Sequence, residues 1–212
     1  MTSTNIRPLG DNSIFRALEV FKDDVFMSLN AVSIGTIQSF NADKQSASIS
    51  LVFKQLLDVG ADGIKTFKEY PLCMECPVFV LQGGGAFITF PIAVGDHCIV
   101  LFCDRAIDNW LYSGSVQAPP IGRAHDISDA IAIVGIRPNP SAISGYLSNG
   151  IRIFLNEDTK IDITDGKIDI KGDVTVHGIL KTVDGSGTIT YNTHIHSGVM
   201  AGGSNTGTPN AV

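Results

Sequence analysis

The sequence predicts a mainly β protein with an N-terminal helix, a small closed barrel, an intertwined trimeric β-helix or prism, and a pointed tip. Three observations predict this fold class. Short apolar runs separated by turn residues follow an initial helical pattern, a repeat of six or seven residues begins after residue 150, and a His-x-His triplet stands near the end. The expected segments are an arm and helix (1–30), the barrel (31–118), a connector (119–150), a β-helical shaft (151–190) and the apex (191–212).

The composition argues against several classes of protein. The chain has 212 residues, of which 44% are hydrophobic, enough for one or two domains with their own cores. The formal net charge is −6 and the Lys and Arg residues are scattered, so nucleic acid is not an expected partner. Residues 1–10 lack the apolar run of a signal peptide, and no stretch approaches the roughly 20 apolar residues of a spanning helix. We therefore expect synthesis in a cytoplasm, without a signal peptide.

Residues 12–29 predict one amphipathic helix. Five apolar residues recur at helical spacing: Ile14, Leu18, Phe21, Val25 and Leu29. Asp11 or Asn12 is available as the N-cap. The apolar stripe needs a cover, which is either the next domain or copies of the helix in neighbouring subunits. The pattern does not choose between these two covers.

The next segment predicts five short strands, at residues 33–40, 47–53, 76–82, 86–91 and 97–103. Turn signals separate them at 41–43, 62–63, 83–85 and 95–96. The three glycines at 83–85 are expected to form a hairpin turn, because no Gly-Lys-Ser/Thr or helix follows to make a phosphate loop. Five strands favour a barrel of the OB type, with a generic barrel or sandwich as the alternative. The connector contains one further strand candidate, Ala130–Ile136.

The four cysteines are Cys73, Cys76, Cys98 and Cys103, and the first two form a C-x-x-C motif. This spacing is compatible with a redox couple or with half of a zinc site. The second pair lies in an apolar run typical of a strand, which makes it a poor partner in such a site. Buried, reduced thiols are therefore the favoured interpretation.

From Gly150 onward, aliphatic and polar residues alternate as in strands with one apolar face. Three short units align, at residues 160–166, 167–172 and 173–178, and each provides one strand and one turn. Six aliphatic side chains then need equivalent faces to pack against: Ile161, Ile163, Ile168, Ile170, Val174 and Val176. Three chains about one axis supply these faces and leave no free strand edge. A single-chain β-helix and a pair of hairpins on an ordinary domain are the alternatives.

His194 and His196 are the candidate metal ligands. Residues i and i+2 of a strand point to the same face, so three chains bring six imidazoles to one axis. Six nitrogens suit an octahedral ion rather than tetrahedral zinc, and we expect one iron ion per trimer, with nickel as the other suitable metal. A complete ligand set leaves no open position for a substrate, so the metal is expected to be structural. A metalloenzyme that uses both residues and His177 is the rival interpretation.

The sequence resembles the central spike proteins of contractile phage tails and related contractile injection machines. The resemblance rests on residues 95–114 and on the tip at 194–209, and it extends over nearly the whole chain. It implies an OB-fold domain on the tail-tube or baseplate hub, a trimeric β-helical shaft, and an apex in which His194 and His196 of three subunits bind iron. The implied protein is a non-catalytic part of the virion that pierces the host outer membrane when the sheath contracts.

The alternative from another class is an OB-fold module that binds a carbohydrate or an oligonucleotide through exposed aromatic side chains. Four aromatic residues lie in strongly apolar runs and are expected in the core instead: Phe87, Phe90, Phe102 and Trp110. The aspartates of the repeat, Asp162, Asp165, Asp169 and Asp173, are expected on the solvated face of the shaft rather than in a catalytic acid pair.

Overall fold

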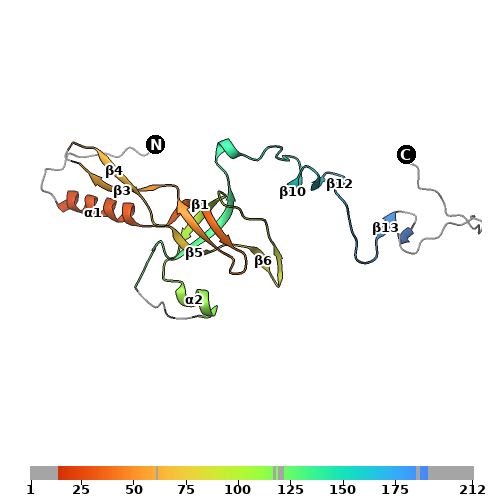
Figure 1. Ribbon diagram of the computed structural model, residues 1–212, viewed down its shortest axis with the longest axis horizontal. Helices are drawn as coiled ribbons and strands as arrows, with labels where there is room; N and C mark the ends of the chain where they lie inside the picture. The colour runs from red at the N-terminus through yellow and green to blue at the C-terminus, as the bar shows by residue number, and fades with distance from the viewer. Residues whose placement is uncertain (1–13, 61, 117, 119–121, 185–186, 191–212) are drawn as a thin grey trace, which may run out of the picture. The chain divides into compact units, whose positions relative to one another are not determined.

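The computed structural model describes residues 14–60, 62–116, 118, 122–184 and 187–190 (Figure 1). The chain divides into two compact units, Met1–Ile143 and Ser144–Val212, and each is described by itself. Both are built mainly of antiparallel strands. Within the described residues, no helix combines the length and apolarity needed to cross a membrane.

The centre of the first unit is a five-stranded antiparallel sheet with the spatial order β5-β2-β1-β8-β9. Its strands are β1 (Val32–Asn41), β2 (Ser46–Leu51), β5 (Cys73–Pro77), β8 (His97–Phe102) and β9 (Ala130–Ile136). The sheet curls, because Val78 forms a parallel bridge with Ala132 and Phe79 N donates to Ala132 O at 2.8 Å. The segment after one edge strand therefore contacts the other edge strand.

Alternation along the strands separates the core from the outer face of the sheet. In β8, Cys98, Val100 and Phe102 are buried, whereas Ile99 and Leu101 are half-buried on the other face. Gly35 of β1 is required by this packing, since a Cβ there would lie against Ile49 and 2.9 Å from Val100 Cγ2. The core comprises Ile37, Ala47, Ile49, Cys73, Cys76, Val78, Cys98, Val100, Phe102, Ala130 and Ala132.

The sequence located four of the five strands of this sheet and misplaced the fifth, β5. β9 coincides with the candidate at 130–136, but it belongs to the sheet, as the partner of β8, and does not lie apart in a connector. The strand predicted at 76–82 was wrong, because β5 ends at Pro77 and the short hairpin of β6 (Leu81–Gly83) and β7 (Ala86–Ile88) begins later. The turn at 83–85 is confirmed, with positive φ at Gly84 and Gly85.

Two further strands in the first unit were not predicted. β3 (Lys54–Val59) and β4 (Lys65–Glu69) pair as a hairpin around the turn signal at 62–63. The helical elements of the first unit are α1 (Ile14–Ser28), which confirms the predicted N-terminal helix, α2 (Asp108–Ser113) and the 3-10 turn η1 (Asn139–Ser141). The proposed N-cap residues Asp11 and Asn12 lie outside the described residues.

A β-bulge explains the orientation of the C-x-x-C motif. Residues i and i+3 of a regular strand face opposite sides, yet Cys73 and Cys76 are 1% and 2% exposed. Between them Glu75 has a φ of 52°, and the register of β2 with β5 shifts. All four cysteines are free, and burial raises the pKa of Cys98 to about 11. Buried thiols are thus confirmed for three of the four, while Cys103 is half-buried.

The second unit contains a three-stranded meander, β10 (Ile151–Asn156), β11 (Thr159–Thr164) and β12 (Lys167–Lys171). A hairpin of β13 (Lys181–Asp184) and β14 (Gly187–Thr190) follows. The described residues of one chain therefore form antiparallel hairpins and no coil of a single-chain β-helix. The third repeat unit, 173–178, contains no strand although all its residues are described, because none of the described strands pairs with it.

Candidate functional site

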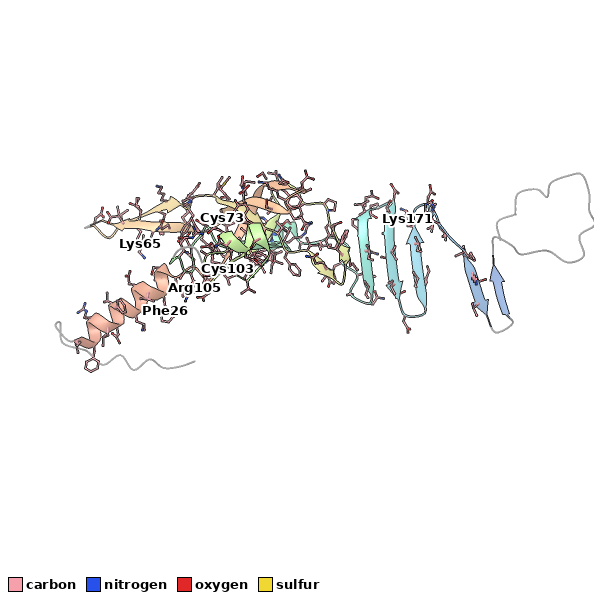
Figure 2. All side chains as sticks on the ribbon, turned by 90° about the horizontal axis from the view of Figure 1, so that it is seen from below. Phe26, Lys65, Cys73, Cys103, Arg105 and Lys171 are labelled. Carbon is pink, nitrogen blue, oxygen red and sulfur yellow. The ribbon has the colours of Figure 1, made fainter. Side chains whose placement is uncertain are left out.

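The meander of the second unit presents an aliphatic face that the described residues of the chain leave open. Strand pairing aligns Ile151 with Ile163 and Ile168, and a second row aligns Ile153 with Ile161 and Ile170. Directly paired residues of antiparallel strands lie on the same face of a sheet, and the three strands lie side by side in Figure 2. Five of these six isoleucines are exposed, from 37% at Ile163 to 66% at Ile168. We call these six residues the isoleucine face.

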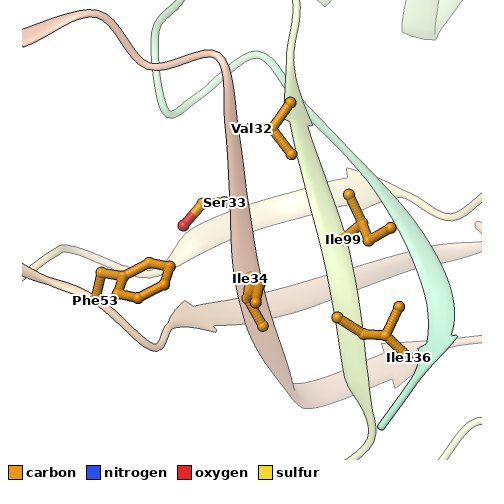
Figure 3. Close-up of a pocket in the computed structure, with 6 residues that line it drawn as sticks. All are labelled: Val32, Ser33, Ile34, Phe53, Ile99 and Ile136. Atoms are coloured by element: carbon orange, nitrogen blue, oxygen red, sulfur yellow. The ribbon is translucent and has the colours of Figure 1, made fainter. Parts of the chain in front are cut away.

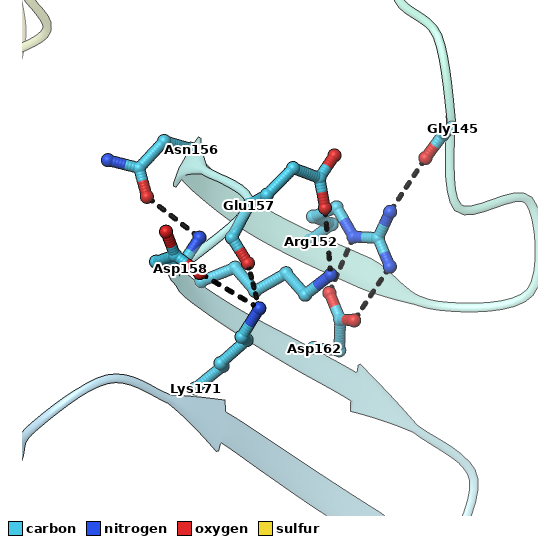
Figure 4. A network of polar contacts seen from close by, with 8 residues as sticks. Gly145, Arg152, Asn156, Glu157, Asp158, Asp162 and Lys171 are labelled. Atoms are coloured by element: carbon cyan, nitrogen blue, oxygen red, sulfur yellow. Dashed lines mark hydrogen bonds and ion pairs between the residues drawn. The ribbon is translucent and has the colours of Figure 1, made fainter.

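The opposite face of the meander carries ion pairs (Figure 4). Arg152 Nε and Nη2 donate to Asp162 Oδ1 and Oδ2 at 2.6 and 2.7 Å, and Nη1 donates to Gly145 O at 2.8 Å. These hydrogen bonds hold the pKa of Asp162 below its usual value. Asp169, directly opposite Asp162 on the next strand, accepts from Lys167 Nζ at 2.7 Å.

This ion pairing agrees with the solvated face expected for the repeat. The bidentate pair stabilises the ionised form of Asp162, whereas a general acid needs a carboxyl whose pKa is raised. Lys171 Nζ donates to Glu157 O and to Asp158 Oδ1, so the turn between β10 and β11 is tied to β12. These contacts connect all three strands of the meander and support a rigid sheet.

A buried ion pair organises the long connection between β8 and β9 in the first unit. Asp129 is completely buried and accepts from Arg123 Nε at 2.9 Å, from Arg123 Nη2 at 2.8 Å and from Ile107 N at 3.0 Å. Arg123 also donates to Asp108 in α2. Its hydrogen bonds to Asp129 raise the pKa of the Arg123 guanidinium. Sequence analysis missed this network, for which the only signal was an Arg and an Asp inside a loop.

An apolar hollow lies on the outer face of the five-stranded sheet (Figure 3). It is lined by Val32, Ser33, Ile34, Phe53, Ile99 and Ile136. None of these side chains ionises, and Ser33 is the one polar side chain among them. The hollow therefore offers packing surface and no acid–base or metal chemistry.

Three of the aromatic residues expected in the core are on the surface instead. Phe102 is 7% exposed, but Phe87, Phe90 and Trp110 are 66%, 70% and 52% exposed. Phe90 follows the end of β7 at Ile88, whereas Phe87 lies in the β6–β7 hairpin and Trp110 in α2, elements in which no residue is buried. Phe87, Phe90 and Trp110 are therefore accessible, and their exposure is compatible with a binding role for this unit.

The candidate metal ligands His194 and His196 lie outside the described residues. His177 is described and exposed in the segment between β12 and β13. Across the described part of the chain, no group of three or more His, Cys, Asp or Glu side chains is arranged to hold a metal ion. His177 thus has no ligand set of its own there, and the C-x-x-C motif has no second pair.

Two family models match the chain. Residues 34–135 match the model described as the phage protein Gp138 N-terminal domain, a span that runs from β1 to β9. Residues 189–210 match the GpV apex motif, and they include His194 and His196. No curated protein sequence matches. Both model families belong to the baseplate spike proteins of contractile phage tails, and this chain combines a segment similar to each of them.

Proposed function

We propose that the protein is the central spike of a contractile tail baseplate, a homotrimer that pierces the host outer membrane on sheath contraction and performs no catalysis. The observation that carries this proposal is the open isoleucine face, which precedes in sequence a segment that matches a spike apex. The sheath supplies the force, and the spike has only to stay folded and narrow.

The trimer follows from the free energy of apolar burial. Each chain exposes two rows of isoleucine, and removing such surface from water contributes roughly 25 cal/mol per Å². A single three-stranded sheet has to bury its apolar face against a second layer. Three copies about a common axis bury all three isoleucine faces against one another and keep the ion-paired faces in water.

An OB-type barrel fits the strand order of the first unit. In chain order the five sheet strands are β1, β2, β5, β8 and β9. The first of them, β1, pairs with the second (β2) and the fourth (β8). In addition, β2 pairs with the third (β5), and β8 pairs with the fifth (β9). The Val78–Ala132 bridge connects the segment after the third strand to the fifth. This is the order of a five-stranded, partly open Greek-key barrel. In the spike this barrel sits on the tail-tube or baseplate hub.

The apex holds iron through His194 and His196. Two imidazoles from each of three chains make six nitrogen donors, and this set fits an octahedral ion. The match to a spike apex motif covers both residues. Bound iron would cross-link the three chain ends. Chain ends are the parts of a protein that fray most readily. Its ligand set leaves no position for a substrate, so its role is structural.

Native mass spectrometry of the purified protein tests the proposal, because one spectrum reports subunit number and metal mass. The expected species is a trimer with one iron ion. The double variant His194→Ala/His196→Ala should lose the iron and keep a folded first unit, whereas the matched control His177→Ala should retain the iron. A monomer, or one metal per chain, would contradict the proposal. A metal-loaded trimer of the double variant would contradict the ligand assignment.

A second candidate function is favoured by the exposed aromatic residues around β7. Phe87 and Phe90 are 66% and 70% exposed, and aromatic side chains on an OB-type barrel stack on nucleobases or sugars. Fluorescence anisotropy with a labelled single-stranded oligonucleotide, and titration with oligosaccharides, would detect this activity. Binding that is lost in Phe87→Ala/Phe90→Ala would favour the second candidate, and its absence would favour a purely mechanical spike.

A further inference from the structure

The helix α1 displays an apolar stripe that the described residues of its own unit leave exposed. Ile14, Leu18, Phe21 and Val25 are 71%, 56%, 66% and 43% exposed, and none of the helix's 15 residues, all of which are described, is buried. An isolated helix of this length is only marginally stable in water, so most of its stability has to come from packing. The sequence was compatible with two covers for this stripe, the next domain or copies of the helix. The described part of the helix's own domain does not cover it.

The spacing of the stripe is that of a coiled-coil seam. The four residues are separated by four, three and four positions, which makes Ile14 and Phe21 d residues and Leu18 and Val25 a residues of a heptad. Phe15 occupies an e position beside this seam and is exposed as well. Leu at a together with Ile at d favours three or four strands over two. The seam therefore fits further copies of the same helix.

The direction of the helices follows from the symmetry of the proposed trimer. A threefold axis makes equivalent helices parallel, so the helix and the isoleucine face require the same symmetry.

We infer that α1 is an intersubunit element: three copies form a short parallel coiled coil about the trimer axis, with Leu18, Phe21 and Val25 in its core. This inference rests on the proposed homotrimer and extends it to the N-terminal end of the chain. The trimer would then be closed by two apolar seams separate in sequence, the helical one before the sheet and the isoleucine face after it.

Cross-linking of the full-length chain with a short bis-maleimide tests the inference. Val25→Cys puts a thiol in the seam, and Asp23→Cys puts one on the opposite side of the same helix as the matched control. Leu18→Cys and Glu19→Cys form a second pair, in case one seam substitution disturbs folding. Each seam variant should give roughly tenfold more cross-linked dimer than its control, because neighbouring thiols in one core layer react at a high effective concentration. Wild-type chain measures the background from its own cysteines.

Native mass spectrometry of the same variants separates the failure of this inference from the failure of the proposed function. Intact trimers whose seam variants cross-link no more than the controls would overturn the coiled coil and leave the spike standing. The stripe, together with the exposed Phe15 and Phe26 outside the seam, would then be a contact surface for another protein such as the hub. Monomers before cross-linking would overturn both.

Discussion

Arg152 and Asp162 form a two-pronged ion pair across β10 and β11, with donor–acceptor distances of 2.6 and 2.7 Å. The two residues are direct partners in the strand register, so the pair locks that register. A slip of one residue would move the isoleucines to the polar side of the sheet. The ion pair thus specifies which side of the meander becomes the isoleucine face.

Asp162→Asn should lower the thermal midpoint of the protein at neutral pH, and the difference from wild type should shrink in acid. The hydrogen bonds from Arg152 lower the pKa of folded Asp162 below 3.8. A depressed pKa contributes stability above the unfolded value, and this contribution is lost as the pH falls through the folded value. Thermal scans between neutral pH and the strongly acidic range would check this. Asp165→Asn, in the turn after β11, is the control, and a difference independent of pH would contradict the ion-pair account.

Ile163→Ala and Ile170→Ala should each weaken the trimer strongly. If the isoleucine face is buried between chains, the truncation removes packed apolar volume and costs about 2 kcal/mol or more per chain. If the face stays in water, the cost should fall within the roughly 0.5 kcal/mol usual for surface substitutions. Sedimentation and denaturant unfolding would distinguish these outcomes. Thr164→Ala, on the polar side of β11, is the matched control.

Asp129→Asn should destabilise the first unit by about 3 kcal/mol, because it breaks a buried ion pair and leaves Arg123 without its carboxylate. For a unit of this size the thermal midpoint should fall by roughly 10 °C. Differential scanning calorimetry would check this, with Asp104→Asn, an exposed aspartate of the same connection, as the control. Equal effects of the two variants would show that the buried network is not the source of stability.

Periodicity in the sequence was sufficient to predict the elements with strong alternation. α1, β1, β8 and the isoleucine face all follow from regular apolar spacing, because one face of each is apolar and the other is not. The hairpin β3–β4 was missed because a register shift between Leu56 and Asp58 breaks the alternation, and no residue of β4 is buried.

Other features depend on contacts that a local pattern does not contain. The inward orientation of both Cys73 and Cys76 requires the left-handed conformation of Glu75, a residue type that gives no signal for it. Asp129 also accepts a hydrogen bond from Ile107 N, and these two residues come together because β8 and β9 pair. The apex ligands His194 and His196 were identified from residue type and spacing, and their geometry stays a prediction.

The third repeat unit provides a test of pairing between chains. Residues 173–178 have the alternation of a strand, with Val174 and Val176 61% and 48% exposed, but no strand forms there within one chain. Backbone N–H groups of an unpaired extended segment exchange rapidly with solvent, and pairing protects them. If neighbouring chains supply the missing partners, hydrogen exchange of the trimer should show protection at 174–176 comparable to that of β12. The turn at 165–166 is the internal control for rapid exchange. Exchange at 174–176 as rapid as in that turn, in an intact trimer, would mean that the shaft ends at β12 and resumes at β13.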